Sequence, residues 1–202
     1  MKILIATGNP HKFKEIIALL PRKTKTGEKL TYVSLSDCDN LHLPPEDGVT
    51  LEQNARLKAS FAAKKTRLFT ISDDTGLEVD ALNGQPGVHT ARYAGEQADT
   101  YDNNRKLLAE LEGLLLDKRS ARFRTVACLA RPDGSTLCFY GTLEGYIGFG
   151  YRGENGFGYD PLFVLPGSHK TLAELSDKQK NKVSHRAQAF EKVAQYLTAL
   201  SF

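Results

Sequence analysis

Apolar runs of strand length alternate with segments of helical period along the chain, a pattern typical of a mixed α/β fold. Residues 2–6 form a short apolar run and predict a buried first strand. Residues 13–20 place apolar side chains at helical spacing, so a helix should follow that strand. Asn9 is suited to the N-cap of this helix and Pro10 to its first position, and Pro21 ends it.

The next part of the chain predicts a second strand and a second helix, with an irregular segment between them. Residues 30–35 have a strand-like pattern, whereas residues 43–48 contain two adjacent prolines that neither a helix nor a central strand accommodates. Thr50 and Gln53 form a capping-box signature. This signature predicts a helix from residue 51 to about residue 65.

The second half of the chain predicts a helix, a β-hairpin and a final helix. Residues 99–116 are mostly of helical pattern. Residues 123–130 and 137–147 predict two strands, and the turn residues 132–135 join them as a hairpin. These strands should add antiparallel members to the sheet. The last helix is expected to begin at residues 176–177 and to continue to the C-terminus.

Two adjacent carboxylates follow a buried apolar run at residues 68–71. Asp73 and Asp74 stand at the expected strand end, and Gly76 permits a tight turn there. Adjacent side chains of a regular strand point to opposite faces, so we expect one carboxylate to face inward and the other to face the turn. Such a pair is suited to Mg²⁺, which takes carboxylate oxygens and keeps several waters. An ordinary turn that ends a strand explains the same residues.

The connection between the first strand and the first helix is a candidate anion site. It contains Gly8, and Lys12 lies in the first turn of the helix. The N-terminus of a helix presents N–H groups and the positive end of its dipole, and a lysine adds a charge suited to phosphate. A routine connection with an exposed lysine is the alternative. The segment lacks the pattern of a Walker A loop.

Asn54 and Lys58 lie four residues apart on one face of the second predicted helix. A solvated helical face is the simplest interpretation of that spacing.

A loop at residues 148–161 contains five glycines with aromatic residues between them. Such a loop is suited to a platform for a flat ligand, because a base stacked on an aromatic ring gains about 1–3 kcal/mol. The alternative is a loop whose aromatic rings enter the core. Lys180, His185 and Arg186 cluster near the start of the last predicted helix. They form either a solvated helix start or a grip on a base edge or on phosphates.

Length, composition and charge limit the class of protein. The 202 residues, 41% of them hydrophobic, are enough for one domain with a substantial core. A formal charge of +3 is too small to indicate binding to a nucleic-acid polymer. Cys38, Cys128 and Cys138 are far apart in sequence, which argues against a disulfide scaffold or zinc site and fits a reducing cytosol. No run is long enough for a signal-peptide core or a membrane span, so we expect a cytoplasmic protein.

Six motifs occur in a fixed order along the chain. They are Thr7-Gly8-Asn9-Pro10-His11-Lys12, Glu52-Gln53-Asn54-Ala55 with Lys58-Ala59, Ser72-Asp73-Asp74-Thr75-Gly76-Leu77, Pro86-Gly87-Val88 with Ala91-Arg92-Tyr93, Gly156-Phe157-Gly158-Tyr159-Asp160-Pro161, and Ser184-His185-Arg186. Together they resemble the inosine triphosphate pyrophosphatase family, which hydrolyses non-standard purine nucleoside triphosphates. The resemblance extends from residue 3 to about residue 197.

The resemblance implies a fold, a cofactor and an assembly. The expected fold is a single α/β domain over residues 1–202, with an elongated, curved, mixed central sheet flanked by helices and two lobes around a nucleotide cleft. The family's activity is Mg²⁺-dependent and converts inosine, deoxyinosine and xanthosine triphosphates to the monophosphate and pyrophosphate. A homodimer in the cytoplasm is expected, with no membrane and no nucleic-acid polymer as partner.

The resemblance also assigns roles to individual residues. The triphosphate-binding segment corresponds to Thr7, Gly8, Asn9, Pro10, His11 and Lys12. Glu46 matches a metal-binding glutamate, and Asp74 matches the catalytic base and metal ligand. The nucleoside-contacting residues correspond to Phe157, Gly158, Tyr159, Asp160, Lys180, His185 and Arg186. Thr75 and Thr90 depart from the family pattern, since serine is commoner at both positions; Thr75 keeps a hydroxyl for substrate contact.

These assignments lead to a mechanistic hypothesis. A water associated with Mg²⁺ attacks the α-phosphorus, Asp74 orients and deprotonates that water, and Glu46 helps to bind the metal. Lys12 and the N-terminus of the first helix neutralise phosphate charge, while Arg186 with His185 bonds the 6-oxo group of the base. Two alternatives are a regulator that binds a purine nucleotide without turnover and a Mg²⁺-dependent pyrophosphatase acting on another modified nucleotide.

Overall fold

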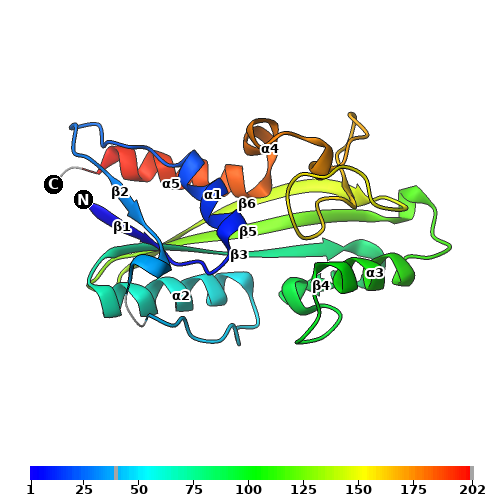
Figure 1. The fold of residues 1–202 in the computed structure, drawn as a ribbon, viewed down its shortest axis with the longest axis horizontal. Helices are drawn as coiled ribbons and strands as arrows, with labels where there is room; N and C mark the ends of the chain where they lie inside the picture. The colour runs from blue at the N-terminus through cyan, green and yellow to red at the C-terminus, as the bar shows by residue number, and fades with distance from the viewer. Residues whose placement is uncertain (39–40, 201–202) are drawn as a thin grey trace. The chain divides into compact units, whose positions relative to one another are not determined.

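The computed structural model describes residues 1–38 and 41–200. Its seven-stranded sheet has the strand order β2-β1-β3-β5-β6-β7, with β4 paired to β3. The strands are β1 (Lys2–Ile5), β2 (Thr31–Val33), β3 (Phe69–Val79), β4 (Pro86–Gly87), β5 (Ser120–Ala130), β6 (Thr136–Ile147) and β7 (Phe163–Val164). β1 is parallel to β2 and β3, whereas β4 and β7 are antiparallel to β3 and β6. The predicted mixed α/β class is therefore confirmed (Figure 1).

The chain also contains five α-helices within the described residues. They are α1 (Pro10–Leu19), α2 (Leu51–Thr66), α3 (Thr100–Glu110), α4 (Asp177–Val183) and α5 (His185–Ala199). Two compact units share these elements. Unit 1 comprises residues 1–74, 125–141 and 185 onward, and unit 2 comprises residues 75–124 and 142–184. No helix in the described part of the chain combines the length and apolar character needed to cross a membrane.

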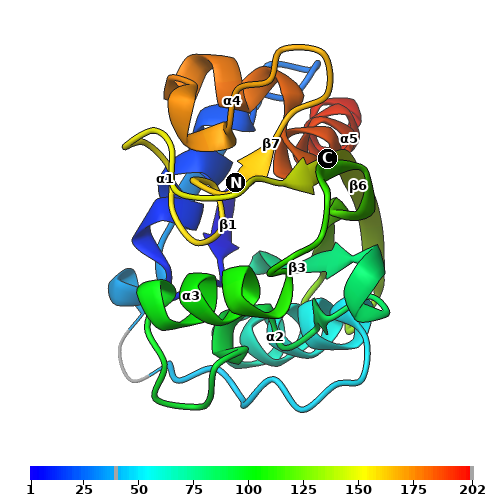
Figure 2. The ribbon, with the colours of Figure 1, turned by 90° about the vertical axis from the view of Figure 1, so that its right-hand side faces the viewer.

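In unit 1 the sheet is covered on both faces, because β1 presents buried apolar side chains to both of them. Ile3 and Ile5 pack in a cluster with Ile16 of α1 and Phe190 of α5. Leu4, between them, points to the opposite face and packs with residues of α2. Figure 1 shows α1 and α5 on one side of these strands and α2 on the other, and Figure 2 agrees. The buried face of α2 includes four fully buried alanines, which permit a close approach to the sheet: Ala55, Ala59, Ala62 and Ala63.

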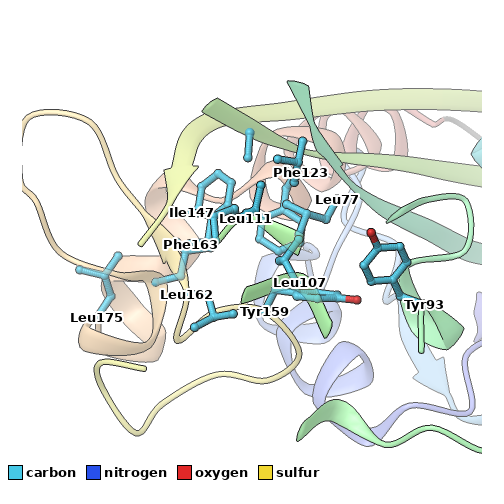
Figure 3. Close-up of a cluster of buried hydrophobic side chains, with 13 residues drawn as sticks. Leu77, Tyr93, Leu107, Leu111, Phe123, Ile147, Tyr159, Leu162, Phe163 and Leu175 are labelled. Atoms are coloured by element: carbon cyan, nitrogen blue, oxygen red, sulfur yellow. The ribbon is translucent and has the colours of Figure 1, made fainter. Parts of the chain in front are cut away.

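Unit 2 has its own apolar core, drawn in Figure 3. Leu107 and Leu111 from the α3 region pack there with Leu77 of β3. The rings of Phe123 and Phe163 lie 4.7 Å apart between centroids. These side chains are almost completely buried, so this cluster is a major source of the stability of unit 2.

Local sequence signals predicted most elements correctly. The Asn9 side chain accepts hydrogen bonds at the start of α1, with Pro10 in its first turn. The Thr50 side chain accepts one from the Gln53 N–H at the start of α2, and the hairpin of β5 and β6 is also confirmed. The helix predicted over residues 99–116 ends earlier, at Glu110. Gly113 follows with a left-handed φ of +77°, which a continuing helix does not adopt.

Two predicted boundaries are wrong. β3 does not stop at Asp73 and Asp74 but continues to Val79, and no tight turn forms at Gly76, because pairing with β4 extends the strand. The last helix is not continuous: Ser184 has extended backbone angles (φ −68°, ψ 155°) and separates α4 from α5. Serine is a favoured N-cap residue, and Ser184 directly precedes α5, but the apolar stripe that continues past it predicted a single helix.

Candidate functional site

The adjacent carboxylates Asp73 and Asp74 lie within β3 and point to opposite faces of it. Asp73 meets Lys12 of α1 and Arg186 of α5, whereas Asp74 meets side chains of α2. This confirms the prediction that the two carboxylates cannot face the same side of a regular strand. Their environments differ enough to give them different chemistry.

Asp73 is buried among cations. Its Oδ2 lies 3.2 Å from Lys12 Nζ and 3.3 Å from an Arg186 guanidinium nitrogen. Burial alone would raise the pKa of Asp73, but the charges of Lys12 and Arg186 outweigh it and hold the pKa well below its ordinary value. A carboxylate with a lowered pKa is a weaker base, so Asp73 is a poor proton acceptor.

The pKa of Asp74 is shifted in the opposite direction from that of Asp73. Burial raises the pKa of this carboxyl above its ordinary value, and the nearby Glu46 carboxylate raises it further, while Lys58 opposes the shift. The Asn54 side-chain amide donates to Asp74 Oδ2 at 3.1 Å, and Lys58 Nζ lies 3.7 Å from Oδ1. A raised pKa makes a carboxylate a stronger base, so Asp74 is the better general base of the pair.

Lys58 connects Glu46, Asp73 and Asp74. Its ammonium donates to Glu46 Oε1 at 2.5 Å and to the backbone carbonyl of Asp73 at 2.8 Å. Only 5% of Lys58 and 1% of Asn54 are exposed, so the interpretation of this helix face as solvated is wrong. Because alanines bring α2 close to the sheet, these two polar residues reach β3 rather than water.

The donor set near Asp74 fits a magnesium ion that arrives with phosphate. Glu46 and Asp74 both lie near the Lys58 ammonium, and the charge of Glu46 raises the pKa of Asp74, so the two carboxylates are close to each other. Among the described residues no group of three or more His, Cys, Asp or Glu side chains could bind a metal on its own. Mg²⁺ is commonly bound by one or two carboxylates plus substrate phosphates and water, so two carboxylates suffice.

The loop between β1 and α1 lies beside β3 because β1 and β3 are parallel neighbours. Asn9 Oδ1 accepts from the backbone N–H groups of His11 and Lys12, at 2.9 and 3.2 Å, and Asn9 N–H donates to the Thr7 hydroxyl. These bonds fix the loop but occupy two of the N–H groups at the helix N-terminus. In this loop the charge available to an anion therefore comes mainly from Lys12, which is half-buried.

Arg186 and His185 are both buried in the first turn of α5, with 1% and 2% of each residue exposed. The Arg186 guanidinium donates to Glu15 of α1 at 2.6 Å and also bonds Asp73 of β3. Arg186 thus connects three elements of unit 1. Its assignment to the base of a nucleotide stays a prediction.

A second group of predicted residues gathers in unit 2. Asp160 Oδ2 accepts from the Phe157 N–H at 2.8 Å and from Lys180 Nζ at 2.6 Å. The Lys180 ammonium lies 4.7 Å from the centroid of the Phe157 ring. Asn104 of α3 donates to the Gly158 carbonyl at 3.0 Å, and this bond ties the loop to α3. Phe157 is half-buried, so this loop holds an aromatic ring in a defined position beside a cation.

Tyr159 does not belong to an exposed platform. It is buried, and its hydroxyl donates to the Thr90 carbonyl at 2.9 Å. The Thr90 hydroxyl accepts from the Leu77 N–H and donates to the Gly87 carbonyl, so threonine here performs the hydrogen bonding that serine would. Thr75, the other departure, follows Asp74 in β3 and is half-buried.

The structure thus divides the predicted residues into two groups. Unit 1 contains the loop of residues 7–12 together with Glu46, Asp74, His185 and Arg186, and unit 2 contains Thr75, residues 157–160 and Lys180. Four buried or half-buried partners had no role predicted from the sequence: Glu15, Asn54, Lys58 and Asn104. Asp73 was predicted only as one of a carboxylate pair suited to Mg²⁺, and its pairing with Lys12 and Arg186 was not predicted. Only the spacing of Asn54 and Lys58 gave a usable signal.

Comparison with known proteins gives consistent matches over almost the whole chain. Residues 3–196 match the model of the Ham1 family. The chain is 58% identical to a dITP/XTP pyrophosphatase of Elusimicrobium minutum, over 96% of this chain and 98% of that protein. It is 42% identical to a dITP/XTP pyrophosphatase of Bacillus subtilis, over 97% of this chain and 96% of that protein.

Two solved structures are similar throughout. A HAM1 protein from Coxiella burnetii has a TM-score of 0.87 and 37% identity, covering 99% of this chain and 100% of that one. A nucleoside-triphosphatase, dITP/XTP pyrophosphatase, from Mycobacterium abscessus has a TM-score of 0.76 and 39% identity, covering 96% and 97%.

Proposed function

Because the chain belongs to the Ham1 family, we propose that it hydrolyses non-standard purine nucleoside triphosphates to the monophosphate and pyrophosphate. The substrates are inosine, deoxyinosine and xanthosine triphosphates, and their removal cleans the nucleotide pool. The observation that carries this proposal is the contrast within β3. Asp74 has a raised pKa and Lys58, Asn54 and Glu46 around it, while Asp73 next to it is held as an anion by Lys12 and Arg186.

Asp74 acts as the general base in this reaction. It accepts a proton from the water that attacks the α-phosphorus, and the bond to the bridging oxygen of the pyrophosphate leaving group breaks. Phosphoryl transfer depends mostly on positioning and on charge stabilisation. Lys58 fixes Glu46 and Asp74 relative to the backbone of β3, and Lys12 supplies positive charge for the phosphate chain.

Mg²⁺ is the proposed cofactor, and Glu46 with Asp74 would bind it. When bound, it would neutralise charge that develops on the phosphate oxygens. Phe157, with Lys180 beside its ring, is the proposed stacking surface for the purine. A homodimer and a cytoplasmic location complete the proposal and rest on the family resemblance.

Hydrolysis in ¹⁸O-labelled water tests the proposed reaction. Attack at the α-phosphorus places the label in inosine monophosphate, because the oxygen of the attacking water stays on the phosphorus that it attacks. Mass spectrometry of both products measures the position of the label. Label in pyrophosphate would move the attack to the β-phosphorus, and absence of the monophosphate would overturn the proposed function itself.

The same product analysis distinguishes the proposed function from two other functions. A regulator that binds nucleotide without turnover gives neither product. A pyrophosphatase for another modified nucleotide leaves inosine triphosphate intact and releases pyrophosphate from that nucleotide. The raised pKa of Asp74 favours an enzyme over a regulator, since nucleotide binding alone does not need a carboxylate of raised pKa.

A further inference from the structure

The hairpin of β5 and β6 brings two cysteines of unit 1 opposite each other. The Arg131 N–H donates to the Ser135 carbonyl at 2.9 Å and closes the turn between these neighbouring strands. Counting back along both strands from this pair places Cys128 opposite Cys138. Ten positions separate these cysteines in the chain, so their spacing in the sequence does not show that they are neighbours.

The type of strand pair at this position brings side chains close together. Hydrogen-bonded and non-hydrogen-bonded pairs alternate along an antiparallel ladder, and the pair of Arg131 and Ser135 is hydrogen-bonded. Cys128 and Cys138 are three steps further along, so they form a non-hydrogen-bonded pair. The Cα atoms of such a pair are about 4.5 Å apart, which lies within the range that a disulfide spans, roughly 4.4–6.8 Å.

The two thiols also share one environment. Both pack in the cluster beneath α2 that contains Ala55 and Ala59. Cys128 is fully buried and Cys138 is half-buried, and both are free thiols. On a non-hydrogen-bonded pair the two side chains lie on the same face of the sheet, so the thiols are direct cross-strand neighbours.

The local environment shifts the pKa values of the two thiols in opposite directions. The neighbouring Cys128 thiol and the Arg56 guanidinium lower the pKa of Cys138, although burial and Glu52 oppose them. The neighbouring Cys138 thiol, together with burial, raises the pKa of Cys128. Cys138 is therefore both the more acidic and the more accessible thiol, and the thiolate is the form that reacts with oxidants.

We propose that Cys128 and Cys138 are an oxidation site, at which a peroxide forms a reversible cross-strand disulfide. The Cys138 thiolate attacks one peroxide oxygen, the O–O bond breaks, and the departing hydroxide takes a proton to give water. The Cys128 sulfur then attacks the sulfenic acid of Cys138, the S–O bond breaks, and the thiol proton of Cys128 leaves with hydroxide as a second water. Two thiols lose two electrons, and the peroxide gains them.

Thiol mapping of the full-length protein before and after hydrogen peroxide tests this proposal. When the samples are denatured before alkylation, the reduced protein should alkylate at all three cysteines and the oxidised protein at Cys38 alone. Cleavage before Asp133, which lies between the paired cysteines, should release two peptides joined through Cys128 and Cys138. Dithiothreitol should restore three alkylatable thiols.

Two variants sharpen the test. Cys38→Ser should keep the bridge, because Cys38 packs in a different cluster. Cys128→Ser should stop the reaction at a sulfenic acid on Cys138 that dimedone traps. The proposal is overturned if wild-type Cys138 accumulates as a sulfinic acid without a bridge, if the main bridge includes Cys38, or if all three thiols stay alkylatable after peroxide.

Discussion

Replacing Asp74 by asparagine should lower turnover of inosine triphosphate by roughly 10²–10⁴-fold, the usual scale for loss of a general base. The change keeps the size of the side chain and its position in β3, but removes the charge and the ability to accept a proton. An amide at this position still has an oxygen for the bond from Asn54. Steady-state kinetics measure the loss, and calorimetry should show that the nucleotide still binds.

The exposed Asp47 provides a matched control for this substitution. Asp47→Asn removes the same charge from the segment that contains Glu46, without touching β3. We expect its turnover to stay within a few-fold of the wild type. If Asp74→Asn behaves like Asp47→Asn, then Asp74 is not the base.

Replacing Arg186 by alanine should lower the free energy of unfolding by about 3–5 kcal/mol, the usual cost of removing one partner from a buried ion pair. The guanidinium of Arg186 is 1% exposed and bonds both Asp73 and Glu15. Its loss leaves Asp73 buried with less compensating charge and leaves Glu15 without this partner. Urea unfolding of the variant measures the loss.

Arg122→Ala is the comparison for an exposed cluster of charges. Arg122 pairs with Asp80 and Glu144, but these groups are substantially solvent-exposed. Exposed ion pairs contribute about 0–1 kcal/mol each, so the loss should be clearly smaller than for Arg186→Ala. Equal losses would contradict the structural role assigned to Arg186.

The same Arg186 variant tests the assignment from sequence. If Arg186 bonds the 6-oxo group of the base, the ratio of kcat/KM between inosine and adenosine triphosphates should narrow in the variant. An unchanged ratio together with lost stability would restrict Arg186 to positioning Asp73 and Glu15. Lys180, beside Phe157, then becomes the candidate for base recognition.

Local signals were reliable where one or two residues decide the backbone. Asn9 and Pro10 set the start of α1, and Thr50 sets the start of α2, as their sequence pattern predicted. The alternation of Ile3, Leu4 and Ile5 between two clusters follows directly from the period of a strand.

Contacts between distant residues were not predictable in the same way. Lys58 lies near Asp74 because the small buried alanines let α2 approach β3 closely. The sequence alone does not show that these alanines face β3. Arg186 reaches Asp73 from the first turn of α5, and the prediction of one continuous helix from residue 176 did not place Arg186 at a helix start. The chemical contrast between Asp73 and Asp74 arises from these distant partners and could not be read from the adjacent pair itself.

The central claim is that this chain converts non-standard purine nucleoside triphosphates to the monophosphate and pyrophosphate, and a colorimetric phosphate assay tests it most directly. The assay compares a panel of purine triphosphates, with and without added inorganic pyrophosphatase and with Asp74→Asn as the blank. We predict phosphate from inosine, deoxyinosine and xanthosine triphosphates only when inorganic pyrophosphatase is present, and much less from adenosine triphosphate. Phosphate released without the added pyrophosphatase, or equal release from every nucleotide, would contradict the claim.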